Sequence, residues 1–315
     1  MSRPMKRTAF RRRTVRLSAV AAVAALALTG CSRASGDGSA PVAAHRVRDL
    51  GYAEDLRVSD AEQRLVARCM ARHGFRYWTD RPLSLAESRP LGYVQDDVDW
   101  ARTHGYGSRI TAKEDRARLH NPNRAYRTGL NATRRAAYDT ALDGGRQAEL
   151  LRTDLPGGGK VSKQTGGCDA EAERRLYGDP GTWFRLDTTA SNLRPLYVGK
   201  LLHDPRFTAA VHAWSACMRR AGHPYPDPDA ARQATREHPA DQTRAEEARS
   251  FAAETRIAVA DATCARRVSL RSVGQEREAH YLAGLGGEYG ARLDAYRQVR
   301  LKALERAERI VPART

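Results

Sequence analysis

The chain has 315 residues, a net charge of +17 and 41% hydrophobic residues. Its basic residues are mostly arginine and are interleaved with acids, and no basic block alternates with aromatic side chains, so a nucleic-acid partner is not expected. We interpret the charge as a solvated surface, with attraction to anionic lipids or wall polymers as the alternative. Apart from residues 17–28, no apolar run approaches the length of a membrane-spanning helix.

The N-terminus has the pattern of a lipoprotein signal peptide. Seven basic residues and no acid precede the apolar run 17–28, which is too short for a bilayer core that needs about 20 residues. The run ends in Leu28-Thr29-Gly30-Cys31, a bacterial lipobox. Residues 1–30 are therefore predicted to be removed, and Cys31 to carry a diacylglyceryl group. Two acyl chains give stable anchoring, so the predicted location is the extracytoplasmic face of the cell membrane.

Two alternatives concern this segment. The first is an ordinary signal peptide with a coincidental cysteine at position 31. The second concerns the export route, because Arg11-Arg12-Arg13 leaves twin-arginine export open beside the general secretory route, which is the default.

Residues 31–58 are expected to form a tether, because residues 32–44 are rich in Gly, Ser and Ala. Helix signals dominate afterwards and begin with a capping box at Ser59 and Glu62. Further helices are predicted at 131–143, 169–177, 204–222, 240–270 and 275–311, the last with a kink at Gly286-Gly287. Loops are expected at 78–95, 154–166 and 223–229, and strand patterns are poor. The prediction is a mainly α, multi-helix fold with a long C-terminal helix.

Four cysteines remain besides Cys31, and an even number in an oxidising compartment indicates two disulfides. A repeat surrounds two of them. Cys69-Met70 and Cys217-Met218 are each followed by Gly five residues after the cysteine and by Tyr eight residues after it. Each copy is typical of a helix end, with Cys and Met buried and the glycine in the left-handed C′ position.

Each copy of the repeat is followed by one further cysteine, Cys168 or Cys264, on another helical segment. Of the three possible connectivities, this order favours Cys69–Cys168 and Cys217–Cys264. It also predicts two related helical halves, residues 59–185 and residues 186–315, each with its own disulfide.

Four segments carry a resemblance to known proteins: the lipobox and residues 121–144, 166–178 and 214–228. They include Asn121-Pro122-Asn123-Arg124-Ala125-Tyr126, Gly166-Gly167-Cys168-Asp169 and Trp214-Ser215-Ala216-Cys217-Met218. In these segments the chain resembles a group of uncharacterised secreted lipoproteins of actinobacteria. The resemblance implies the envelope location and the same disulfide pairing, and it implies no reaction.

No motif in the sequence points to catalysis. Gly-x-Ser-x-Gly, Ser-x-x-Lys and His-Glu-x-x-His are all absent. Gly157-Gly158-Gly159-Lys160 lacks the spacing of a phosphate loop and is interpreted as a loose loop. Asp96-Asp97-Val98-Asp99 is interpreted as an acidic helix start rather than a cation site. No catalytic residue, metal ligand or cofactor is predicted.

The candidate for ligand contact is the stretch from His223 to Asp229, where Tyr225 would stack on a ligand and Asp227 would bind it. The favoured interpretation is structural: a rigid, proline-rich exit from the Cys217 helix, followed by a helix cap. Trp214 is interpreted as a core residue that packs on the disulfide.

The sequence thus predicts a membrane-anchored, extracytoplasmic, non-catalytic protein of the cell envelope that acts by binding or scaffolding. One alternative is an envelope hydrolase with an unrecognised site, which a pocket with two buried carboxylates or a Ser/His pair would favour. Another is the solute-binding subunit of a transporter, which a central parallel sheet would favour.

Overall fold

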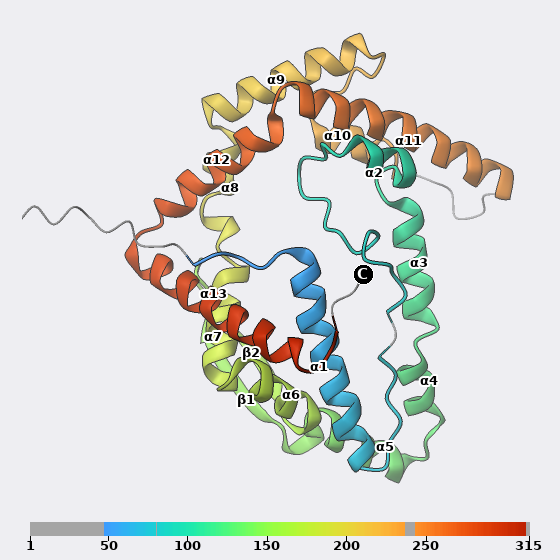
Figure 1. The fold of residues 1–315 in the computed structure, drawn as a ribbon, viewed down its shortest axis with the longest axis vertical. Coiled ribbons are helices and arrows are strands. Elements are labelled where there is room, and N and C mark those ends of the chain that lie inside the picture. The colour runs from blue at the N-terminus through green and yellow to red at the C-terminus, as the bar shows by residue number, and fades with distance from the viewer. Residues whose placement is uncertain (1–46, 80, 237–242, 313–315) are drawn as a thin grey trace, which may run out of the picture. The chain divides into compact units, whose positions relative to one another are not determined.

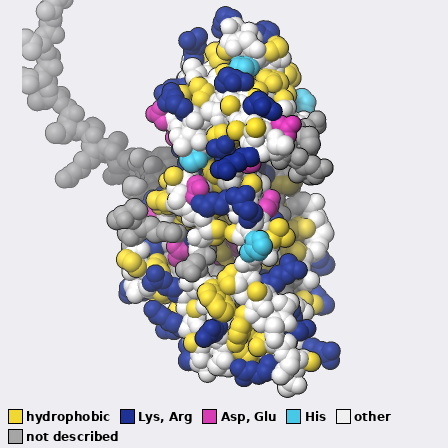
Figure 2. Space-filling view, turned by 90° about the vertical axis from the view of Figure 1, so that its right-hand side faces the viewer, with side chains coloured by type: hydrophobic (Ala, Val, Ile, Leu, Met, Phe, Trp, Pro, Cys, Tyr) yellow, Lys and Arg dark blue, Asp and Glu magenta, His cyan; other side chains and the backbone are white. Residues whose placement is uncertain are grey.

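The computed structural model describes residues 47–79, 81–236 and 243–312 and is mainly helical (Figure 1). The predicted signal peptide and Cys31 lie outside these residues. Across the described ranges, no helix has both the length and the apolar composition needed to span a membrane. Figure 2 shows Lys and Arg side chains scattered over one face rather than gathered into a single patch, in line with a solvated surface.

The first copy of the Cys-Met repeat ends helix α1 (Tyr52–Arg72) with a Schellman motif. Met70 is fully buried on this helix. Gly74 follows with φ of +75°, and the N–H of Phe75 donates to the carbonyl of Met70 at 3.0 Å. Glycine takes this left-handed C′ position without the steric penalty that a Cβ would bring.

The second copy ends helix α9 (Pro205–Arg220) in the same way. Gly222 has φ of +83°, and the N–H of His223 donates to the carbonyl of the buried Met218 at 2.9 Å. The two copies therefore share their backbone geometry as well as their residues, as the repeat predicts.

Each disulfide joins one of these helices to a later helix. Cys69 of α1 pairs with Cys168 of α6 (Gly167–Tyr177), and Cys217 of α9 pairs with Cys264 of α11 (Arg244–Arg267). This is the pairing that the order of the repeats favours. All four cysteines are buried.

The larger apolar clusters form around the two disulfides. The C-terminal helix α13 (Gly287–Glu308) buries Ala303, Leu304 and Ala307 in the first cluster, against α1 and α6. Chain order alone had placed this helix with the second half, residues 186–315. The small side chains of Ala303 and Ala307 let α13 approach the first cluster closely, which no local pattern in the sequence reveals.

Shorter helices connect these elements. They are α2 (Val98–His104), α3 (Ser108–Leu119), α4 (Pro122–Gly129), α5 (Ala132–Asp143), α7 (Pro180–Ser191), α8 (Val198–Leu202), α10 (Pro228–Gln233) and α12 (Leu270–Ala283), with 3-10 turns at Gly145–Gln147 and Arg194–Leu196. Asp97 caps α2 by accepting the N–H of Trp100 at 3.0 Å, as predicted for an acidic helix start. Asn131 and Asp204 cap α5 and α9 in the same way.

The predicted start of the first helix is wrong. α1 begins at Tyr52, and Ser59 lies inside it. Its N-cap is Gly51, whose N–H donates to the side chain of Glu54 at 2.8 Å, and Arg48 pairs with the same carboxylate. Glu54 occupies the N3 position and accepts the N–H of the N-cap residue, which is the contact predicted for Glu62.

The C-terminal segment also divides differently from the prediction. Three helices, α11, α12 and α13, replace the two that were predicted over 240–270 and 275–311. Ser269, with φ of +53°, separates α11 from α12, and Gly286, with φ of +90°, separates α12 from α13. The expected kink at Gly286-Gly287 is therefore a break between two helices.

One hairpin interrupts the helices, where a loop over 154–166 had been predicted. Strand β1 (Glu149–Asp154) pairs antiparallel with β2 (Lys160–Thr165), and Gly158 and Gly159 turn the chain with positive φ. Val161 is the only strongly apolar residue of β2, so the alternation was too weak to detect. The described part of the chain contains no parallel sheet, which is the feature that would favour a transporter subunit.

Candidate functional site

Three cavities stand out among the described residues, and we name them A, B and C. Cavity A, of about 430 Å³, lies between the β1–β2 hairpin, α7 and the start of α13. Cavity B, of about 350 Å³, lies beside α8, α9 and α12. Cavity C, of about 670 Å³, lies between α1, the segment around Trp78 and the residues that join α3 to α4. Cavity A is lined by four charged side chains from three distant parts of the chain, so it is the candidate functional site.

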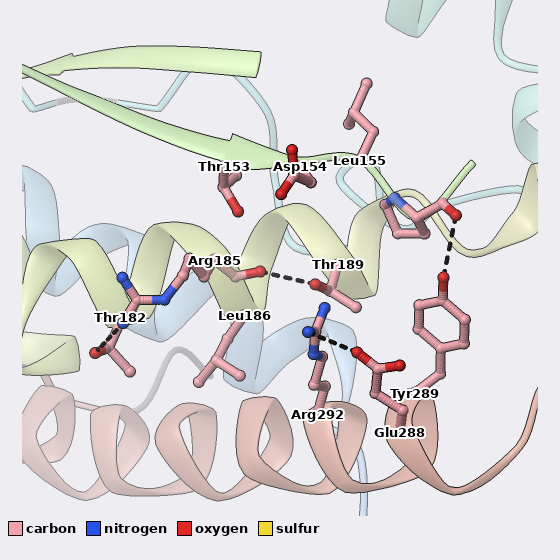
Figure 3. Close-up of a pocket in the computed structure, with 11 residues that line it drawn as sticks. Thr153, Asp154, Leu155, Thr182, Arg185, Leu186, Thr189, Glu288, Tyr289 and Arg292 are labelled. Carbon is pink, nitrogen blue, oxygen red and sulfur yellow. Dashed lines mark hydrogen bonds and ion pairs between the residues drawn. The ribbon is translucent and has the colours of Figure 1, made fainter. Parts of the chain in front are cut away.

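The walls of cavity A come from three elements (Figure 3). From α7, Thr182, Arg185 and Thr189 recur at spacings of three and four residues, so they share one face of the helix. Leu186 of α7 also lines the cavity, and the first turns of α13 and the hairpin supply the rest: Glu288, Tyr289 and Arg292, and Thr153, Asp154, Leu155 and Pro156.

One hydrogen bond connects two of these walls. The hydroxyl of Tyr289 donates to the carbonyl of Pro156 at 3.1 Å, which joins α13 to the hairpin turn. Within α7, the hydroxyl of the buried Thr189 donates to the carbonyl of Arg185 at 2.9 Å. The Tyr289 bond therefore fixes the position of α13 relative to the hairpin at cavity A.

The charged groups of cavity A form only weak ion pairs. Arg292 pairs with Glu288 at 2.7 Å on the same helix, and Asp154 pairs with Lys160 at 3.0 Å across the hairpin. Both pairs are exposed, so each contributes only about 0–1 kcal/mol to stability. A charged ligand can therefore replace either partner at little cost. Arg185 donates to the hydroxyl of Thr182 at 2.9 Å, and no ion pair of Arg185 is recorded within the described residues.

This arrangement suits binding better than bond cleavage. Two guanidinium groups can hold a carboxylate or a phosphate, and two carboxylates can hold an ammonium group. The lining contains no histidine, cysteine or lysine that would act as a base or nucleophile, and the Tyr289 hydroxyl is already bonded to backbone. Its carboxylates, Asp154 and Glu288, are exposed rather than buried.

Buried carboxylates occur elsewhere, at Glu173, Asp204, Glu254 and Asp261. Each accepts hydrogen bonds from the surrounding protein, and none of the four lines cavity A, B or C. Burial raises the pKa of Asp261 to about 6, against hydrogen bonds from Trp214 and Tyr106 that lower it. Cavity C holds one serine and one histidine, Ser59 and His120, and no hydrogen bond joins them in the described structure. The arrangements that would favour a hydrolase are therefore not found in these cavities.

The predicted ligand-contact loop does not join any of the three cavities. His223 donates its N–H within the Schellman motif, and Tyr225 packs against the second apolar cluster. Asp227 accepts the N–H of Ala230 at 2.9 Å and caps α10. These contacts fit the structural interpretation of the stretch, and Trp214 is likewise a fully buried core residue.

The closest set of metal-ligand residue types in the described structure is Cys69, His73 and Cys168. Both cysteines are joined in a disulfide, so neither offers a thiolate to an ion while that bond is intact.

The residues of cavity A were not found from the sequence. Arg185, Arg292 and Glu288 each stand on an amphipathic helix, where exposed charges are common. Only the assembly of α7, α13 and the hairpin brings them together, and neither α7 nor the hairpin had been predicted.

Comparison with known proteins adds no family to these observations. No protein-family model, no curated protein and no solved structure matches the chain.

Proposed function

We propose that the protein is a lipid-anchored, extracytoplasmic binding protein of the cell envelope, and that cavity A binds a zwitterion, a free amino acid or a short peptide. The observation that carries the proposal is the convergence of Arg185 and Arg292 with Asp154 and Glu288 on one space of about 430 Å³. A ligand with one carboxylate and one ammonium group matches both signs of charge.

The chemistry of the lining supports this ligand class in detail. Arg185 offers guanidinium donors in the planar fork that matches a carboxylate. Asp154 reaches the cavity from the opposite wall, as Figure 3 shows, where it can accept from an ammonium group. The hydroxyl of Thr182 adds a short-range partner for a peptide group.

The proposed lipid anchor is inferred from the N-terminal sequence pattern. The lipobox at Leu28-Thr29-Gly30-Cys31 follows a charged segment and an apolar run of signal-peptide length. The first described helix, α1, begins only at Tyr52. A diacylglyceryl group on Cys31 would hold the binding body at the membrane surface.

Binding is tested by calorimetric titration of the purified protein with alanyl-alanine. We expect saturable binding that weakens when the ligand's amine is acetylated or its carboxylate is amidated. Arg185→Ala should weaken binding about 10- to 100-fold, because a charged hydrogen bond contributes about 1.5–3 kcal/mol. The matched control is Arg175→Ala, an exposed arginine of α6 that does not line cavity A. Equal binding by Arg185→Ala, or no binding by the wild type, would refute the assignment of cavity A.

The anchor is tested separately with Cys31→Ala. The wild type should fractionate with membranes and incorporate a labelled fatty acid, and the variant should do neither. A variant that still incorporates the label would overturn the assignment of Cys31.

A further inference from the structure

Cavity B differs from cavity A in its walls and shares no lining residue with it. Its floor belongs to the second apolar cluster, through Val94, Leu201 and Phe207, which are all buried. Val198 and Leu202 of α8 continue this apolar surface, and Leu202 remains 45% exposed. Cavity B is therefore an apolar recess that opens to the surface at α8.

A glycine in the middle of α12 makes room for this recess. Arg271, Gly274 and Glu278 share one face of the helix, and that face lines cavity B. A Cβ added at Gly274 would lie 3.4 Å from the ring of Phe207. The backbone at Gly274 is ordinary helix, so no backbone strain requires glycine there, although glycine weakens a helix interior by about 1 kcal/mol relative to alanine. The missing side chain leaves the Phe207 ring open to the cavity.

The polar rim of cavity B carries two arginines and one glutamate. Glu278 accepts the hydroxyl of Tyr197 at 2.6 Å, and Arg271 pairs with Asp96 at 2.6 Å. Arg194 is exposed and lines the cavity without an ion pair among the described residues, and its charge acts on the nearby Tyr197 hydroxyl. Since Arg271 is already paired with a carboxylate, Arg194 is the cation of the rim that remains for a ligand of opposite charge.

We propose that cavity B binds an amphiphile with a single alkyl chain and one carboxylate, with the chain against Phe207 and Leu201 and the carboxylate at Arg194. Ligand sites in proteins are mostly apolar recesses with a few fixed polar groups, and cavity B has this composition. The site is separate from cavity A and does not depend on the function proposed for it.

The test uses octanoate as the probe and the full chain with Cys31→Ser, so that no acyl chain of the protein competes. Calorimetric titration should show one site for octanoate and weaker binding of hexanoate, because each buried methylene raises affinity up to about fourfold. Octylammonium, with the same chain and the opposite charge, should bind at least tenfold more weakly. Equal binding of octanoate and octylammonium would overturn the role of Arg194.

Two variants locate the site. Gly274→Leu fills the recess and should abolish octanoate binding, whereas Gly290→Leu, at a helical glycine of α13 with no atom within 4 Å of an added Cβ, should leave it unchanged. Arg194→Gln leaves the apolar walls intact and should reduce octanoate affinity about tenfold without changing the affinity for octanol. Octanoate binding that survives Gly274→Leu, or that Arg194→Gln leaves unaltered, contradicts the proposal, whether or not Gly274→Leu lowers the melting temperature.

Discussion

Nε1 of Trp214 donates a 2.8 Å hydrogen bond to Oδ1 of Asp261, and both side chains are fully buried. Each residue stands three positions before a cysteine of the Cys217–Cys264 disulfide. The hydrogen bond therefore joins α9 to α11 one turn away from the covalent bond. It places an ionisable carboxyl group in the second apolar cluster, and a dependence of stability on pH follows.

Stability should fall as pH rises from 5 to 7. Burial raises the pKa of Asp261 from its ordinary value near 3.8 to about 6, so the native state holds a proton that the unfolded chain has already released. A shift of this size corresponds to about 3 kcal/mol of stability in all, which is lost from about pH 4 upward. About 1.3 kcal/mol of it is lost between pH 5 and 7, and the free energy of unfolding levels off above that window. Carboxylates whose pKa is lowered, such as Glu87, change the stability only at lower pH, where protonation removes their contribution.

Urea unfolding at pH 5, 6 and 7 measures this slope. Asp261→Asn should reduce it, because the amide does not titrate. Burial and neighbouring carboxylates also raise the pKa of Asp169 to about 6, so this residue should account for a further share of the slope, which Asp169→Asn tests. A slope that neither variant changes would exclude both groups as its cause.

The two disulfides should differ in their contribution to stability. Cys69–Cys168 spans 99 residues and Cys217–Cys264 spans 47. Replacing either pair by alanine should cost about 2–5 kcal/mol, with about 0.7 kcal/mol more for the longer loop, since loop entropy grows with the logarithm of length. Denaturant unfolding of the two double variants gives the comparison. The opposite order would show that native-state packing, rather than loop length, sets the difference.

The segment before Cys168 should tolerate no side chain at Gly167. Its φ is +54°, and an added Cβ would lie 2.5 Å from the carbonyl oxygen of Ala141 in α5. Gly167→Ala should therefore cost more than about 3 kcal/mol. Gly74→Ala is the control, because Gly74 also has positive φ but no atom within 4 Å, and it should cost about 1–2 kcal/mol. Thermal unfolding of both variants separates close approach from backbone strain.

Two ion pairs between α9 and its neighbour α12 should behave very differently. Arg277 contacts the buried Asp204 at 2.9 Å, whereas Arg206 and Glu276 meet at 2.6 Å on the exposed side. Arg277→Ala should cost clearly more than Glu276→Ala, because it leaves the solvent-shielded carboxylate of Asp204 without its cation. Glu276→Ala should cost at most about 1 kcal/mol. Similar costs in denaturant unfolding would mean that burial does not govern these pairs.

Local features of this fold could be predicted from the sequence. Gly74 and Gly222 end their helices, and Asp97, Asn131 and Asp204 cap theirs, because each acts on backbone groups within a few residues. The mainly helical fold follows from helix caps and helical spacing along the chain, and the cysteine pairing follows from the Cys-Met repeat. The start of α1 was wrongly predicted at Ser59, because the actual N-cap is Gly51 with Glu54 at N3, and this cap lacks the usual Ser or Thr.

Features that depend on distant contacts could not be predicted. Nothing near Ala303 indicates that it packs against α1, and nothing near Arg185 or Arg292 indicates that they face one cavity. Both outcomes depend on how whole helices pack, and helix packing leaves no short-range sequence pattern. The candidate site was therefore missed, and of the three elements that build it only α13 had been predicted, as part of a helix over 275–311.

The place of α13 in the first cluster has a consequence for the newly made chain. The ribosome makes α1 and α6 before α13, so the first cluster cannot be completed until the chain extends through Ala307. The surfaces of α1 and α6 that α13 covers have no contact with that helix before this point. A truncation ahead of Ala303 would therefore remove part of the core that holds the N-terminal helices.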